Sequence, residues 1–162
     1  MMVVATAGYC EEPSKPAQET LLKVDAVILK DVEGVDPLFG KTFFSVMAKV
    51  QNISKENITL SAWSCSYAED WVTDNKSIFP RQLNCKNNVL YAIALKPGET
   101  REFTLAMSRP SNVLLKDIRF KLGYKAKRPI GEFKRTPIAG EPFWSDDVIL
   151  HIKPVPERQQ KQ

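Results

Sequence analysis

Apolar and polar residues alternate one by one through several segments of this chain, and this alternation constrains its fold more than any other feature. The alternation is clearest in residues 41–52 and 115–126. A period of two predicts β-strands that have one buried face and one face in water. The residues that we expect to be buried together are Phe44, Val46, Val50, Leu105, Phe120 and Leu122.

Seven or eight such segments follow one another, and turn residues separate them. The apolar period of three to four residues that is typical of a helix never persists over ten residues. Strands without crossover helices pair antiparallel, so we predict an all-β fold, a two-sheet antiparallel β-sandwich of seven to eight strands. The strand count resembles immunoglobulin-like and fibronectin type III-like domains. The antibody spacing, in which two cysteines flank a Trp, is absent, because Trp63 precedes Cys65.

Two hairpins are expected between strands that are neighbours in the sequence. Residues 41–52 would pair with residues 57–66, and residues 89–95 would pair with residues 100–107. The second pair is joined by Lys96-Pro97-Gly98-Glu99. Proline presets φ and glycine accepts a positive φ, which together favour a type II turn.

The 162-residue chain is most simply one domain. We assign residues 1–18 to a leader remnant and flexible tether, residues 19–155 to the β-sandwich domain, and residues 156–162 to a disordered tail. No stretch approaches the ~20 apolar residues of a membrane-spanning helix, so no integral membrane span is expected.

The small residues Ala5-Thr6-Ala7 before a polar tract resemble the end of a secretory signal peptide. They favour export to an extracytoplasmic compartment, either periplasmic or secreted. Cys65 and Cys85 lie 20 residues apart, and in an exported protein a disulfide between them is expected. Cys10 would then be lipidated, paired between chains or free. The alternative is a cytosolic protein in which Cys65 and Cys85 are two buried thiols.

The residue types that carry catalysis are scarce. The single histidine, His151, lies on the outward face of a predicted strand, so we expect no enzyme activity. Cysteine and histidine do not cluster, and no phosphate-binding loop is present, so we expect neither metal nor cofactor. Acidic residues in loop 69–75 leave calcium as a minor alternative. The net charge of +4 is spread along the chain, which does not favour nucleic acid as a partner.

Two long predicted loops, residues 67–79 and 128–144, contain aromatic residues beside charges. Aromatic residues with neighbouring Arg or Lys are enriched at interaction hot spots. The candidate binding residues in and beside these loops are Tyr67, Trp71, Phe79, Lys127, Arg128, Phe133 and Trp144. Alternatively, Trp71 and Trp144 fold back as lids over the ends of the core.

The sequence therefore predicts a non-enzymatic, exported binding or interaction module that recognises a protein or glycan partner through these loops. One alternative is a cytosolic accessory or assembly domain that pairs with its partner through a sheet edge. The other is an enzyme-inhibitor-like domain that inserts one protruding loop into a cleft. The sequence leaves the oligomeric state open.

Overall fold

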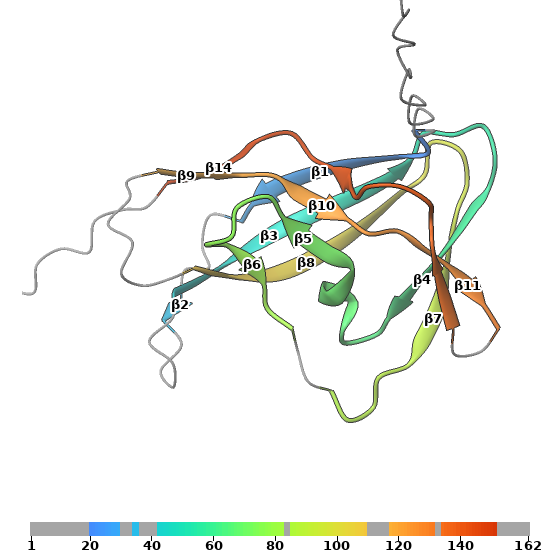
Figure 1. The fold of residues 1–162 in the computed structure, drawn as a ribbon, viewed down its shortest axis with the longest axis horizontal. Coiled ribbons are helices and arrows are strands. Elements are labelled where there is room, and N and C mark those ends of the chain that lie inside the picture. Colours follow the sequence, from blue (N-terminus) through green and yellow to red (C-terminus); the bar gives the residue numbers. More distant parts are fainter. Residues whose placement is uncertain are drawn as a thin grey trace, which may run out of the picture.

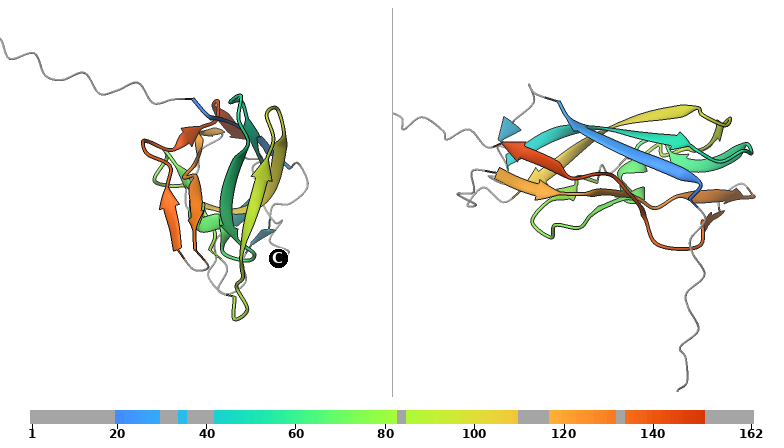
Figure 2. Two further views of the ribbon diagram at one scale, coloured as in Figure 1. Left: turned by 90° about the vertical axis from the view of Figure 1, so that its right-hand side faces the viewer. Right: turned by 90° about the horizontal axis from the view of Figure 1, so that it is seen from above.

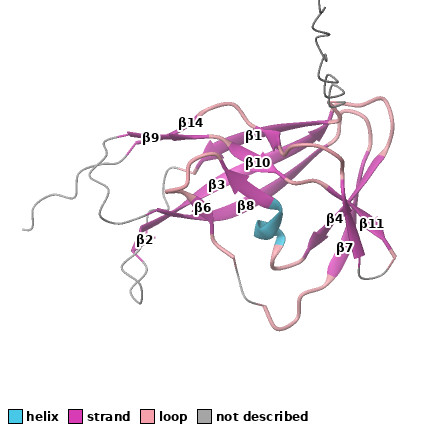
Figure 3. Ribbon diagram, in the orientation of Figure 1, coloured by secondary structure: helices cyan, strands magenta, loops and turns pink. Residues whose placement is uncertain are grey.

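The computed structural model describes residues 20–29, 34–35, 42–82, 85–109, 117–131 and 134–151. Apart from one short 3-10 helix, the regular elements of this part are β-strands (Figures 1 and 3). None of its helices is long and apolar enough to cross a membrane. The predicted leader (1–18) and tail (156–162), together with Phe133, lie outside the described residues.

The elements follow one another along the chain as β1 (Leu22–Ile28), β2 (Gly34–Val35), β3 (Thr42–Asn52), β4 (Ile58–Trp63), η1 (Tyr67–Asp70), β5 (Trp71–Thr73), β6 (Phe79–Pro80), β7 (Leu90–Leu95), β8 (Thr100–Arg109), β9 (Asp117–Phe120), β10 (Leu122–Tyr124), β11 (Lys127–Ile130), β12 (Lys134–Pro137), β13 (Phe143–Trp144) and β14 (Val148–His151). All their pairings are antiparallel, and they form several open sheets.

The largest sheet has the strand order β1-β3-β8-β6, and β2 also pairs with β3. Its centre is the long β3–β8 pair, which runs in register from Thr42 opposite Arg109 to Gln51 opposite Thr100. β6 adds to the far edge of β8 only at Phe79 and Pro80. The rest of that edge receives no strand among the described residues.

The last strands form a long ribbon in which β9 pairs with β14, β10 with β13, and β11 with β12. β5 pairs with the other edge of β10. β11 also lies beside β4, and β4 in turn pairs with β7. Seen from the end, β12, β11, β4 and β7 follow one another across one side of the molecule, and β7 is the outermost (Figure 2).

The predicted core is confirmed. Residues from the large sheet and from the C-terminal ribbon are buried in one cluster, and the six predicted members are all in it: Phe44, Val46, Val50, Leu105, Phe120 and Leu122. The rings of Phe44 and Phe120 meet edge to face, with 6.0 Å between their centroids. The period-two pattern therefore identified the buried faces correctly.

The two predicted hairpins are wrong. β3 pairs with β1, β2 and β8, whereas β4 and β7 pair with each other. The turn between β7 and β8 has the expected form, because Gly98 has φ +80° and the Glu99 N–H donates to the Lys96 carbonyl at 3.0 Å. Turn chemistry determines that the chain reverses, but it does not determine the strand with which the next segment pairs. Here both connections carry the chain from one sheet to another.

Asn52 holds these two connections side by side. Its side-chain Nδ2 donates to the carbonyl of Glu56 at 2.7 Å and to that of Leu95 at 2.9 Å. Its main-chain N–H donates to Glu99, and its carbonyl accepts from Gly98. Asn52 is completely buried, so its carboxamide needs these partners inside the protein. One residue thereby joins the β3–β4 connection to the β7–β8 connection.

Candidate functional site

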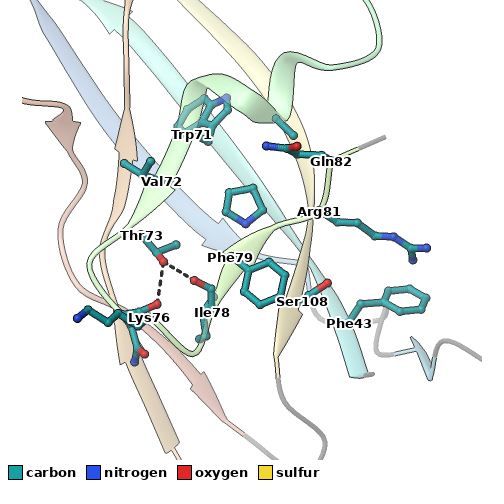
Figure 4. A pocket seen from close by; sticks show the side chains of 13 residues that line it. Phe43, Trp71, Val72, Thr73, Lys76, Ile78, Phe79, Arg81, Gln82 and Ser108 are labelled. Carbon is teal, nitrogen blue, oxygen red and sulfur yellow. Dashed lines mark hydrogen bonds between the residues drawn. The ribbon is translucent and has the colours of Figure 1, made fainter. Parts of the chain in front are cut away.

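A surface pocket of about 640 Å³ lies where β5 and β6 meet the ends of β3 and β8 (Figure 4). Three aromatic residues line it: Phe43, Trp71 and Phe79. Lys76 and Arg81 also line it, together with the polar residues Thr73, Asn75, Gln82 and Ser108. The described lining contains no Asp or Glu. A concave site of this size with aromatic walls and a few polar groups suits a ligand.

A tight turn between β5 and β6 shapes one wall of this pocket. The Thr73 hydroxyl contacts the carbonyls of both Asn75 and Ile78 (Figure 4). The Ile78 N–H donates to the Asn75 carbonyl at 3.0 Å, which closes the turn. Phe79 and Pro80 then join β8, and the Arg81 N–H donates to the Ala106 carbonyl at 2.7 Å. The turn is therefore held at both ends, because β5 pairs with β10 before it and β6 pairs with β8 after it.

Trp71 forms the inner part of the pocket, and the prediction that it lies exposed in a loop is wrong. It starts β5 opposite Tyr124 and is only 3% exposed. Its ring lies 4.8 Å from that of Tyr124 and 5.6 Å from that of Phe103, measured between centroids. The segment 67–79 is not a long loop but η1, β5, the tight turn and the start of β6. The aromatic cluster draws it onto the core.

Polar atoms are buried in this cluster as well. Within the described part of the chain, the Trp71 indole N–H and the Tyr124 hydroxyl have no hydrogen-bond partner. Burial, with the nearby Asp70 carboxylate as the next cause, raises the pKa of Tyr124 far above its ordinary value. Tyr124 therefore stays protonated, and it acts as a packing residue rather than as an acid or base near neutral pH.

Asp70, the residue before Trp71, holds two cations in the interior. Its carboxylate contacts Lys127 Nζ at 2.7 Å and Arg135 Nη1 at 2.6 Å, and its side chain is 2% exposed. Its main-chain carbonyl accepts from the Lys125 N–H at 2.7 Å. The Arg135 guanidinium also lies over the Trp63 ring, 5.5 Å from the centroid. These contacts tie η1 to the β11–β12 hairpin.

This hairpin corrects the second predicted loop. Residues 128–137 are mostly paired in β11 and β12 rather than irregular. Lys127, predicted to bind a partner, instead binds Asp70 within the chain. Sequence reasoning missed the roles of Asp70 and Arg135, because they are 65 residues apart and no short-range pattern links them.

The remaining predicted binding residues do not converge on the pocket. The half-buried Tyr67 donates its hydroxyl to the Thr104 carbonyl at 2.7 Å. Arg128 is exposed beside a separate hollow of about 820 Å³ at residues 53–59, whose described lining has no aromatic residue. Trp144 is 39% exposed and covers Gly123, where an added Cβ would lie 2.8 Å from its ring. Phe79 and Trp71 are the predicted residues that share the pocket.

Cys65 and Cys85 are both free thiols in the structure, so the predicted disulfide stays a prediction. The two side chains are neighbours. A hydrogen bond with Cys65 is the main reason that the pKa of Cys85 is raised. The structure thus brings together two cysteines that are 20 positions apart along the chain.

Ligands for a metal do not gather among the described residues, where no group of three or more His, Cys, Asp or Glu side chains could hold an ion. In the acidic segment 69–75, Asp70 binds cations and Asp74 Oδ1 accepts from the Lys121 N–H at 2.7 Å. His151 lies at the surface, with Nδ1 2.8 Å from Asp117 Oδ1. Neither arrangement forms a metal site.

No protein-family model matches this chain, and neither does any curated protein or solved structure. Between the two large hollows, we select the pocket beside Phe79, because it combines an exposed aromatic side chain with a rigid floor.

The two tryptophans should respond differently to truncation. We expect Trp71→Ala to lower the free energy of unfolding by about 3–5 kcal/mol, because it opens a cavity in the aromatic cluster. Trp144→Ala should lower it by about 1 kcal/mol or less, because the ring is partly in water. Urea denaturation measures both losses. Equal losses would contradict the placement of Trp71 in the core.

Proposed function

We propose that this chain is an exported, non-enzymatic binding domain that holds an acidic segment of a partner protein in the pocket beside Phe79. The observation that carries this proposal is the combination of aromatic and cationic residues around one concave surface. We further propose that the sheets form a two-layer sandwich of the immunoglobulin-like or fibronectin type III-like kind. The two connections at Asn52, which pass between sheets, support that architecture.

Phe79 is the proposed anchor of the interaction. Phe79 is 44% exposed, while Trp71 in the same pocket is buried and Pro80 pairs with β8. A large apolar side chain presented on a rigid support loses little conformational freedom on binding. Phe79 can therefore cover an apolar side chain of the partner at small entropic cost.

The charges around the pocket favour an acidic partner. Lys76 and Arg81 line it, and no Asp or Glu is among its described lining residues. Charge complementarity of this kind increases the rate of association and discriminates against basic partners. A neutral glycan carries no acidic group for Lys76 to contact. We therefore favour a protein segment that has an apolar residue next to Asp or Glu.

Selection from a displayed library of random peptides, with the whole chain as the target, tests the proposed binding pocket. We expect the selected peptides to be enriched in an apolar residue next to Asp or Glu. Phe79→Ala should weaken their binding about 30-fold, which corresponds to about 2 kcal/mol at a hot spot. Lys76→Glu should weaken it about tenfold through charge repulsion.

Two variants serve as controls for these changes. Trp144→Ala removes an exposed aromatic side chain elsewhere, and Lys55→Glu reverses an exposed charge beside the other hollow. Both should retain wild-type affinity. Peptides without acidic residues, or peptides that bind Phe79→Ala as tightly as the wild type, would refute the proposed site.

Export is supported by the neighbouring thiols of Cys65 and Cys85. In an oxidising compartment a pair so placed is expected to form a disulfide. Peptide mapping of unreduced protein from its native source should recover the two cysteines in one linked fragment. Recovery of both as free thiols would contradict export.

A further inference from the structure

β7 lies at one side of the molecule (Figure 2). Among the described strands, β4 alone pairs with β7, from Ile58 opposite Leu95 to Trp63 opposite Leu90. β7 contains six residues, none of them charged, and the uncharged stretch extends from Asn87 to Leu95.

The hydrogen-bond pattern between β4 and β7 shows which main-chain groups of β7 point toward its outer edge. The Ser64 N–H donates to the Val89 carbonyl at 2.9 Å, which makes this pair a hydrogen-bonded one. Hydrogen-bonded residues alternate along an antiparallel strand, so Val89, Tyr91 and the following odd-numbered residues face β4. The N–H and C=O groups of the three residues between them therefore point away from the sheet: Leu90, Ala92 and Ala94.

Three other edge strands of the described part, β1, β6 and β12, have protective features that β7 lacks. β1 carries Lys23 and Asp25, which form an exposed ion pair at 3.0 Å. β6 has only two residues and one of them is Pro80, and β12 carries Lys134 and Pro137. Charges, prolines and short length are the usual means by which proteins block pairing at an edge. An open, uncharged edge is a template for another strand.

We propose that the β7 edge pairs antiparallel with β7 of a second copy of this chain. A two-fold axis at Ala92 would place Ala92 opposite Ala92 of the second copy, and Leu90 opposite Ala94 of the second copy. Every outward N–H and C=O of the three residues then finds a partner, because outward-facing residues oppose one another.

The side chains are compatible with this register. Ala92 and Ala94 are small and exposed, so they allow the two strands to approach without a clash. The register also places Lys96 opposite Asn88 of the second copy, so the flanking cations do not oppose one another. Self-complementarity of this kind is what an isologous dimer requires. The β7 edge shares no residue with the pocket beside Phe79. A failure of the dimer proposal would therefore leave the proposed function unaffected, and the reverse also holds.

Sedimentation equilibrium of the full chain tests the dimer between about 1 μM and about 1 mM, the range of weak complexes. We expect the wild type to approach twice the 18.3 kDa monomer mass as its concentration rises. Ala92→Pro should remain monomeric, because proline removes an outward N–H without breaking a bond to β4. Ala92→Thr, which keeps that N–H, should associate like the wild type.

If Ala92→Pro does not fold, Ala94→Lys decides the question, because it adds a charge to an exposed edge position without removing any contact. We expect it to weaken association at least tenfold. A wild type that stays monomeric overturns the proposal and leaves a strand of another protein as the occupant of the edge. Association that persists in Ala94→Lys or Ala92→Pro overturns it as well, because another surface then forms the dimer.

Discussion

The hydrogen bonds of the buried Asn52 carboxamide determine how the strands of this protein can pair. They join the β3–β4 connection to the β7–β8 connection, so that both pass between sheets at one place. As a result β8 pairs with β3, and β7 pairs with β4. The far edge of β8 is then free to receive β6, which forms a wall of the pocket, and the outer edge of β7 receives no strand from the described residues. Both proposed binding surfaces depend on this arrangement.

The sequence predicted the buried faces well and the pairing of strands poorly, and the physical reasons differ. Which face of a strand is buried follows from the alternation of its own residues, as in Phe44, Val46 and Val50. Pairing depends on contacts between distant residues, such as the bond from Asn52 to Leu95, 43 positions away. The Pro97-Gly98 turn has the predicted conformation. It gives no information about the strand that β8 meets after the turn.

The candidate site could be predicted only in part for the same reason. Phe79 was identified from its aromatic character beside charges, and the structure places it at the pocket. Lys127 has a similar sequence context, yet its charge is directed inward by Asp70, 57 positions earlier. Trp71 follows Asp70 directly, and its burial with Tyr124 and Phe103 shows no periodic pattern along the chain. Local composition thus identifies residues that are able to bind a partner, but it does not show which of them are engaged inside the fold.

The stability of Asn52→Ala tests the central claim most directly. Besides its two donated bonds, the Asn52 carboxamide accepts from the N–H and hydroxyl of Ser54 at 2.9 and 2.7 Å. Removing it takes a donor from the Glu56 carbonyl and from the Leu95 carbonyl, whose bond is buried, and an acceptor from Ser54. Denaturant unfolding should therefore show a loss of about 2–4 kcal/mol. Asn57→Ala, at an exposed position on the same connection, should change stability by less than about 0.5 kcal/mol. A loss below about 1 kcal/mol for Asn52→Ala would show that the pairing of these strands does not depend on Asn52.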